Sequence, residues 1–449
     1  MDEKHIGILK ELGFDEIDSA KMTNDYWKKR GADALALTTQ DRDVYGCLDH
    51  TVGEGVRLFD VEGTEYIDAT GGVAVRALGL RYKPYLDFQT RVLDVVHEFP
   101  GSDFDAIPQT LLAEKLAELT PGTHKKRVAF TTSGGRAVEG CMKSAMDLTG
   151  KRRFVAFRPA FHGRTGYALS LTASNSKHKS GFPQGVDVIR VSYPYCYRCP
   201  YGQNVEDCNL ECVEALRYAL QVEGNDIAAT VMEPICGEGG LIVPPAKAIK
   251  GFFEVTKEAG AYFMSDEVQA GMGRTGKWCA IEHHGVVPDF ISMAKALGGG
   301  YPMGASIGPA PMYTGAARHS ETFSAEPKMS LLALWILKHM EDGGFLKRNS
   351  ANGAYLIKRL NELVEKHEVA GDARGIGLMA GIEFVKDKKS KEKAPKLRNN
   401  IVKNLVQKQN LWVLGCGQNV IRFTPSYVIT KEDIDESVER FDKAIFAES

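Results

Sequence analysis

The stretch RVAFTTSGGRAVEGCMKSAMDLTG, residues 127–150, joins a short apolar run to a longer amphipathic run through Ser133, Gly134 and Gly135. The first run is rich in β-branched and aromatic residues, which predicts a strand, and the second has helical spacing. Small residues at such a turn let backbone N–H groups face an anion, and the helix dipole favours a phosphate there. An ordinary turn without a ligand is the alternative reading of this strand–turn–helix unit.

The same alternation of strand and helix patterns extends over about residues 108–330. Further examples are the strand patterns RRFVAFR, DIAATVMEP and AYFMSDEV and the helical patterns QTLLAEKLAEL and AKAIKGFFEVTKEAG. Such alternation predicts an α/β fold with a mostly parallel, doubly wound sheet and helices on its two faces. In sheets of this kind, ligands bind beyond the carboxyl ends of the strands.

The two ends of the chain have a different character. Residues 1–40 have a helical pattern, residues 56–68 predict a β-hairpin, and a long helical pattern covers roughly residues 328–368. The remaining C-terminal residues predict a small α+β domain. We expect residues 1–75 to form the N-terminal segment of the small domain, 76–330 the large ligand-binding domain, and 331–449 the C-terminal part of the small domain.

The overall charge argues against polyanionic partners. The chain has 56 Lys and Arg against 58 Asp and Glu, a formal net charge of −2, so we expect no nucleic acid and no membrane among its partners. The first thirty residues are charged throughout and lack the apolar core of a signal peptide. No run approaches the roughly 18 apolar residues of a membrane-spanning helix. We therefore expect a cytoplasmic protein.

Two of the predicted strands are followed by residues that suit the wall of a ligand pocket. Phe161 and His162 follow RRFVAFR, and an aromatic ring beside an anion site can stack on a flat ligand. Glu233 and Glu238 lie in the Gly-rich loop EPICGEGG after the strand IAATVM. A packed aromatic residue and an ordinary acidic turn are the alternatives when each motif is taken alone.

Two further residues are placed where an ionisable side chain is costly. Asp266 lies at the end of a predicted buried strand, where a carboxylate needs a cationic or hydrogen-bonding partner. Lys295 lies in the small, apolar run PDFISMAKALGGGYPMG, residues 288–304. A lysine in such surroundings can lose proton affinity and act as a Schiff-base amine, whereas a lone lysine is ordinarily a surface residue.

Taken together, these loops resemble the class III pyridoxal-phosphate aminotransferases of fold type I over about residues 50–430. The most specific stretch is SDEVQAGMGRTGKWCAIEHHGVVPDFISMAKALGGGYPMGA, residues 265–305, in which Lys295 follows Asp266 by 29 residues. Other pieces similar to the family are AFHGRTGYALSLT, MEPICGEGG, ETFSAEP and IRFTPS. Five such motifs in the family's order are far more specific than one.

The resemblance implies pyridoxal 5'-phosphate as the cofactor. It implies that Lys295 bonds to the cofactor aldehyde and then moves the substrate proton, and that Asp266 pairs with the pyridine nitrogen. Thr322 would reach the phosphate of a neighbouring subunit, which implies a homodimer or a dimer of dimers. The other cofactor-binding residues that the resemblance implies are Ser133, Gly134, Gly135, Phe161, His162, Glu233, Val268 and Gln269.

For the substrate, the resemblance points to the ω-amino-acid transaminases. Arg422 resembles the carboxylate clamp of that group, and Glu238 resembles the acid that pairs with this arginine when no carboxylate needs it. Val73 stands where those enzymes have an apolar pocket wall. These residues imply transfer from a 4-aminobutyrate-, ornithine- or lysine-like donor to 2-oxoglutarate.

Departures from the family pattern leave other functions open. Arg136 stands where the phosphate turn usually has an acid, and Cys236 stands where a glutamine is common. The same fold and cofactor residues also serve amino-acid racemases and epimerases, which are the second hypothesis. A non-catalytic, metal-stabilised scaffold is the third, and it predicts that the cofactor absorbance band is missing and that Lys295→Ala changes no phenotype.

Four of the nine cysteines fall within seventeen residues. Cys196 and Cys199 form a C-x2-C pair, and Cys208 and Cys212 form a C-x3-C pair. This spacing in a polar loop fits a structural zinc site with four cysteine ligands, outside the proposed cofactor loops. Two disulfides and four free thiols are the alternatives, and the redox state of the compartment decides between them.

Overall fold

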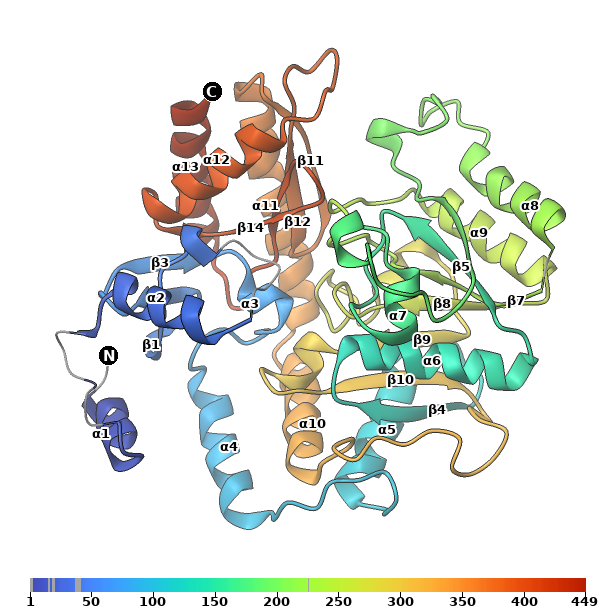
Figure 1. The fold of residues 1–449 in the computed structure, drawn as a ribbon, viewed down its shortest axis with the longest axis horizontal. Coiled ribbons are helices and arrows are strands. Elements are labelled where there is room, and N and C mark those ends of the chain that lie inside the picture. Colours follow the sequence, from blue (N-terminus) through green and yellow to red (C-terminus); the bar gives the residue numbers. More distant parts are fainter. Residues whose placement is uncertain (1–2, 15–16, 18–20, 37–41, 225) are drawn as a thin grey trace.

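Alternate residues of strand β5 (Arg153–Arg158) face opposite sides of a central sheet. The computed structural model describes residues 3–14, 17, 21–36, 42–224 and 226–449. Phe154 and Ala156 belong to an apolar cluster with α6 (Gly134–Thr149) and α7 (Gly166–Leu171). Val155 and Phe157 pack on the other side, where α8 (Glu211–Glu223) and α9 (Ala246–Glu258) lie. Helices therefore cover both faces of the sheet (Figure 1).

The central sheet has seven strands in the order β4-β10-β9-β8-β7-β5-β6. β10 runs antiparallel to its neighbours β4 and β9, and the other pairs are parallel. The mostly parallel, doubly wound α/β fold is confirmed. The other strand bounds are β4 (Lys126–Thr131), β6 (Val188–Ser192), β7 (Ile227–Met232), β8 (Tyr262–Asp266), β9 (Phe290–Met293) and β10 (Gly304–Pro309).

Two smaller sheets have the strand orders β1-β2-β3-β13 and β11-β12-β15-β14, and the first of them joins segments far apart in the sequence. In one, the predicted hairpin forms from β2 (Arg57–Asp60) and β3 (Glu65–Asp68), and Ile67 of β3 lies beside Leu411 of β13. This pairing ties the two chain ends together and supports our proposal that residues 1–75 and 331–449 share one small domain. The remaining strands are β1 (Leu48–Glu54), β11 (Ala370–Ile376), β12 (Met379–Phe384), β13 (Leu411–Trp412), β14 (Leu414–Cys416) and β15 (Val420–Phe423).

The helical pattern at 328–368 forms two helices rather than one. α10 (Pro327–Asp342) ends before Gly343, and Gly344, with a φ of 61°, precedes α11 (Phe345–Lys366). Glycine adopts this left-handed conformation without steric penalty, so the glycine pair ends one helix and begins the next.

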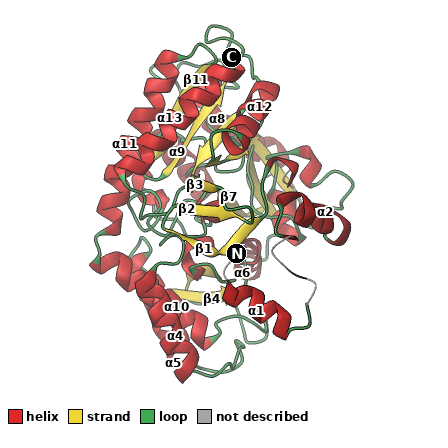
Figure 2. Ribbon diagram, turned by 90° about the vertical axis from the view of Figure 1, so that its left-hand side faces the viewer, coloured by secondary structure: helices red, strands yellow, loops and turns green. Residues whose placement is uncertain are grey.

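The remaining helices lie mostly around the two smaller sheets and along the lower edge of the molecule in Figure 1 (Figure 2 gives the side view). Parts of the helical pattern predicted for residues 1–40 fall on residues outside the described ranges. Among the helices that are described, none is long and apolar enough to cross a bilayer. Their bounds are α1 (Glu3–Glu11), α2 (Asn24–Ala34), α3 (Gly71–Ala74), α4 (Lys83–Val95), α5 (Ile107–Leu119), α12 (Pro395–Gln407) and α13 (Lys431–Glu448).

Candidate active site

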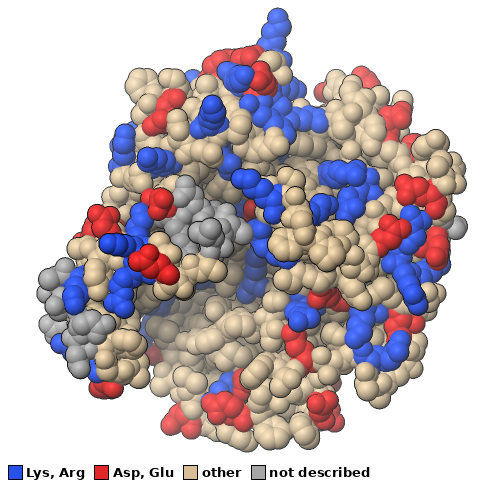
Figure 3. All heavy atoms as spheres, viewed as in Figure 1, with Lys and Arg blue, Asp and Glu red and all other residues tan. Residues whose placement is uncertain are grey.

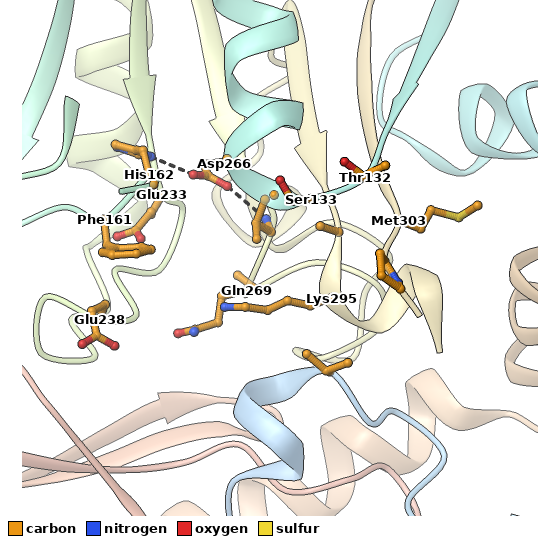
Figure 4. Close-up of a pocket in the computed structure, with 18 of the residues that line it drawn as sticks. Thr132, Ser133, Phe161, His162, Glu233, Glu238, Asp266, Gln269, Lys295 and Met303 are labelled. Atoms are coloured by element: carbon orange, nitrogen blue, oxygen red, sulfur yellow. Dashed lines mark hydrogen bonds and ion pairs between the residues drawn. The ribbon is translucent and has the colours of Figure 1, made fainter. Parts of the chain in front are cut away.

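A cavity of about 320 Å³ lies where the turns after β4, β5, β7, β8 and β9 meet (Figure 4). This is the carboxyl-end position that a doubly wound sheet predicts for a ligand. Val73, Thr322 and Arg422 are not among the residues that line it. The sequence-predicted residues that do line it are Ser133, Gly134, Gly135, Phe161, His162, Glu233, Glu238, Asp266, Val268, Gln269 and Lys295.

Asp266, the last residue of β8, is held in place by three hydrogen-bonding groups. Its Oδ2 lies 2.7 Å from Nδ1 of the buried His162, and its Oδ1 accepts hydrogen bonds from Ser292 Oγ and the Val268 backbone N–H, both at 3.1 Å. Burial lowers the pKa of His162, but the Asp266 carboxylate offsets this, so that the pKa lies above its ordinary value. Fixed groups therefore orient the carboxylate and give both of its oxygens a hydrogen-bonding partner.

Lys295 begins a short 3-10 helix, Lys295–Gly298, directly after β9, with a φ of 47°. Burial and the charge of Arg422 lower the pKa of Lys295 to about 8, while Asp266 and two glutamates partly oppose this. At pH 7 a lysine with this pKa has about a tenth of its amine in the neutral, nucleophilic form, far more than an ordinary lysine. Its side chain extends across the cavity in Figure 4.

The turn before α6 has the features of an anion cradle. Ser133 caps the helix by accepting a hydrogen bond from the Arg136 N–H through its Oγ, 3.4 Å away. A Cβ added to Gly134 would lie 2.6 Å from Val268 Cγ1, so only glycine allows this close approach. The Arg136 side chain is 64% exposed and pairs with Glu139 and Glu321, so it points to solvent rather than into the cradle.

Glu233 and Gln269 contribute buried oxygen atoms that lack partners among the described residues. Burial raises the pKa of Glu233 to about 7, and His162 opposes this shift. Oε2 of Glu233 and Oε1 of Gln269 accept no hydrogen bond within the described part of the chain. A buried acceptor of this kind is costly unless a ligand or water donates to it.

Glu238 stands at the edge of the cavity and binds a buried arginine. Its Oε2 accepts a hydrogen bond from Arg422 Nη1 at 2.8 Å, and the side chains of Glu238 and Arg422 are 24% and 2% exposed. Arg422 lies on β15 and therefore reaches the site from the four-stranded sheet β11-β12-β15-β14 rather than from the central sheet. The ion pair thus joins the two parts of the fold at the cavity mouth.

These groups fit pyridoxal phosphate, the cofactor that the family resemblance implies. The helix N-terminus at Gly134 and Gly135 suits a phosphate, and the oriented side chain of Asp266 suits a protonated ring nitrogen. The partnerless Gln269 Oε1 suits a ring substituent that donates a hydrogen bond. The amine of Lys295 suits an aldehyde.

Two predicted residues lie elsewhere. Val73 is 40% exposed, and Val75 lines the cavity in its place, because Gly72, Val73 and Ala74 all have positive φ values and turn the chain through a left-handed bend. Thr322 lies at an exposed position beside Phe323, which is 70% exposed.

The sequence reasoning missed several residues around the cavity. Tyr301 and Met303 line it and belong to the YPMG run that follows Lys295, so the family-like spacing could have identified them. Ser292, which supports Asp266, had no such signal, because only the pairing of β8 with β9 brings the two residues together.

The structure does not support the zinc site predicted at the cysteine cluster. All nine cysteines are free thiols, and no group of three or more His, Cys, Asp or Glu side chains in the described ranges is arranged to hold a metal ion. Cys196, Cys199, Cys208 and Cys212 do line one cavity of about 20 Å³. Burial raises the pKa of Cys212 to about 11, which keeps that thiol protonated. Close spacing in sequence therefore brought the sulfurs near one another without forming a ligand set.

Comparison with known proteins gives consistent matches along the chain. The family model described as "Aminotransferase class-III" matches residues 39–445. A leucine/methionine racemase of Thermococcus litoralis is 34% identical over 90% of this chain and 92% of its own, and a probable 4-aminobutyrate aminotransferase of Bacillus subtilis is 33% identical over 86% and 90%. The structure of an omega transaminase from Pseudomonas jessenii in complex with PMP has a TM-score of 0.87, with 26% identity over 94% of this chain and 97% of its own.

Proposed function

The chain belongs to the class III aminotransferases, and from that premise we propose that it transfers the amino group of an ω-amino acid to 2-oxoglutarate. The donor would be 4-aminobutyrate-, ornithine- or lysine-like. The observation that carries this proposal is the Glu238–Arg422 ion pair at the cavity mouth. A carboxylate clamp with its own internal counter-ion suits an enzyme that must bind two different substrates in turn.

The ion pair explains how one site can accept both substrates. Arg422 is buried, and a buried cation without a partner is strongly destabilising, so Glu238 neutralises it while a donor without a nearby second carboxylate is bound. When 2-oxoglutarate enters, its carboxylate can take the place of Glu238 in a bidentate pair with the guanidinium. Glu238, which is partly exposed, is free to turn toward solvent.

The residues around Lys295 divide the chemical work. Pyridoxal phosphate, when bound, supplies an electron sink for the carbon that bears the substrate amine. Asp266, oriented by His162 and Ser292, holds a proton at the ring nitrogen. Lys295 Nζ, with its pKa lowered to about 8, takes the proton from the carbon that bears the donor's amine in the first half of the reaction. In the second half it gives a proton to the corresponding carbon of the acceptor.

An assay of several donors tests the proposal. Purified holoenzyme given 4-aminobutyrate, ornithine, lysine or β-alanine with 2-oxoglutarate should form glutamate from at least one of them. The Lys295→Ala variant, which keeps the rest of the cavity, should form none. Failure of every amino donor to produce glutamate would refute the proposal.

Racemisation is the second candidate, and the relative in Thermococcus litoralis favours it. That racemase is 34% identical over 90% of this chain, as close as the aminotransferases found. Lys295 would remove the proton from one face of the substrate carbon, and a second acid or a water molecule would return a proton on the opposite face. A single enantiomer of leucine or methionine that loses optical rotation without any keto acid would establish this activity, and chiral analysis of the donor assay separates the two candidates in one experiment.

We further propose that the active unit is a homodimer in which Thr322 reaches the phosphate site of the neighbouring subunit. Support comes from exposed apolar side chains near Thr322, which a monomer rarely leaves uncovered. Phe99, Phe104 and Phe323 are 56–70% exposed, and the Gly101 N–H donates to Ser324 O at 3.4 Å, which brings the two segments together.

Mixing two inactive variants tests this arrangement. If Thr322 acts across the interface, a Lys295→Ala chain combined with a Thr322→Asp chain restores one intact site per mixed dimer. Up to about a quarter of the parent activity should then return after random mixing of equal amounts. No recovery in mixed dimers isolated by two affinity tags would show that Thr322 acts within its own chain or not at all.

A further inference from the structure

A second cavity, of about 380 Å³, adjoins the candidate active site at Glu238, which lines both. It lies between the small domain and the loop after β5, and we call it the outer chamber. Its charged lining residues are the cations Arg164, Arg398 and Lys403 and the single acid Glu238. Figure 3 shows Lys and Arg side chains gathered around the middle of this face, where the two parts of the molecule meet.

The outer chamber has more positive charge than its one carboxylate can balance. Glu238 already accepts a hydrogen bond from Arg422. It is also the only carboxylate of the described chain that raises the pKa of Arg164 or of Arg398, and burial lowers both pKa values. Within that same part of the chain, no ion pair to Arg164, Arg398 or Lys403 is formed.

Arg398 is built into the wall of the chamber rather than lying free on its surface. Its Nη1 donates to Val420 O at 3.3 Å and its Nη2 to Gln418 O at 3.1 Å, while its buried Nε has no acceptor among the described residues. A Cβ on Gly415 would lie 1.8 Å from Nη1, so the glycine makes room for the guanidinium. Neutral carbonyls orient the cation but do not neutralise it.

The other lining groups are suited to the same ligand. The amide side chains of Asn175, Asn399 and Asn400 line the chamber and can donate hydrogen bonds. His178 also lines it, and burial with the nearby charge of Arg164 lowers the His178 pKa, which leaves it a neutral hydrogen-bonding group near pH 7. An oriented guanidinium surrounded by neutral donors is the arrangement that recognises a carboxylate or a phosphate.

We propose that Arg398 and Lys403 of α12 form an outer anion subsite, which selects a substrate that carries a carboxylate or phosphate several bonds beyond the group held at Arg422. The inference rests on the proposed function, because it concerns the substrate of that same site. The anion would supply the counter-charge that the single carboxylate of Glu238 does not provide for these cations. An arginine oriented by two carbonyls and a flexible lysine together suit an end group whose position varies with chain length.

Calorimetric titration of the holoenzyme tests the subsite without turnover. The probes are α,ω-dicarboxylates from glutarate to suberate, monocarboxylates of equal length, and the same chains with one phosphonate end. The parent protein should bind the long two-ended anions at least about tenfold more tightly than the matched monocarboxylates, the ratio expected for one charge-assisted hydrogen bond. Lys403→Gln and Arg398→Gln should reduce this preference to less than about threefold.

The choice of variants keeps the test independent of folding. Lys403 is exposed, so its replacement should leave the fold intact even if Arg398→Gln disturbs β14 and β15. Lys396→Gln removes the same charge from the same helix at an exposed position outside the chamber, and it should keep the full preference. Tighter binding of the phosphonate chains would identify a phosphorylated substrate, and equal or weaker binding would identify a dicarboxylate.

Two results would overturn the inference. One is equal affinity of the parent protein for two-ended and one-ended anions at every length. The other is a preference that Lys403→Gln and Arg398→Gln both retain. Glutamate formation is measured separately, so a protein that forms no glutamate but loses its dicarboxylate preference in the variants contradicts the proposed function and supports the subsite.

Discussion

Replacing Lys295 by methionine should stabilise the protein once pyridoxal phosphate has been removed. Burial and the charge of Arg422 lower the Lys295 pKa from 10.5 to about 8, so the folded chain holds this proton less tightly than the unfolded chain. At about 1.36 kcal/mol per pH unit, the difference lowers the free energy of unfolding by up to about 3 kcal/mol when both states are protonated. Methionine has similar length without the charge and avoids this loss.

The sign of the pH dependence follows from the same two values. Below pH 8 the amine is protonated in both states, and the destabilisation is complete. Between pH 8 and 10.5 the folded chain has already released the proton while the unfolded chain still holds it, so stability rises with pH. The advantage of Lys295→Met should therefore be largest near pH 7 and should fade between pH 8 and 10.5.

Urea unfolding at equal chain concentration, at pH 7 and at pH 10, measures the effect. Lys358→Met on α11 is the matched control, because Lys358 is exposed and its loss should not reproduce the pH-dependent gain. A Lys295→Met variant that is no more stable than the parent at pH 7, or that gains as much at pH 10 as at pH 7, would refute the reasoning.

Three other perturbations have defined outcomes. Gly353→Ala on α11 places a Cβ 2.1 Å from the Gly377 backbone and should lower the free energy of unfolding by at least about 2 kcal/mol, and an unchanged urea midpoint would contradict this close packing. Burial raises the Glu233 pKa to about 7, so stability falls as pH rises from 4.5 to 7, and Glu233→Gln should gain stability over the parent at pH 8 but not at pH 4, as unfolding across pH would show. Asp266→Asn removes the charge beside His162 and should slow amino transfer by about a hundredfold or more, whereas an initial rate within tenfold of the parent would count against its role.

The central sheet and the position of its ligand cavity could be predicted because both follow from local patterns. Each strand is short, apolar and followed by a turn, and parallel strands bring the turns at their carboxyl ends to one edge. Asp266 and Lys295 therefore meet although 29 residues separate them.

Features that depend on tertiary contacts could not be predicted in the same way. Val75 lines the cavity and Val73 does not, because of the left-handed bend at residues 72–74. Sequence spacing does not reveal positive φ values at a valine. The glycine pair at residues 343–344 is a signal for a helix break, but the helical pattern on both sides of it favours one continuous helix. The four clustered cysteines line one small cavity, but the predicted zinc site is not supported, because spacing alone does not distinguish a metal site from free thiols.

The charges at Glu238 connect substrate recognition with the proton affinity of Lys295. Arg422 lowers the Lys295 pKa, and Glu238 raises it. A substrate carboxylate that binds Arg422 adds a negative charge near the amine, whereas displacement of Glu238 toward solvent removes one. The net effect on the Lys295 pKa is therefore small if the exchange is one for one, so both substrates can use a lysine of nearly the same pKa.

A second anion in the outer chamber would break this balance and raise the Lys295 pKa, because it adds negative charge without displacing another acid. Substrates with and without a distal anion should accordingly differ in the pH dependence of their turnover.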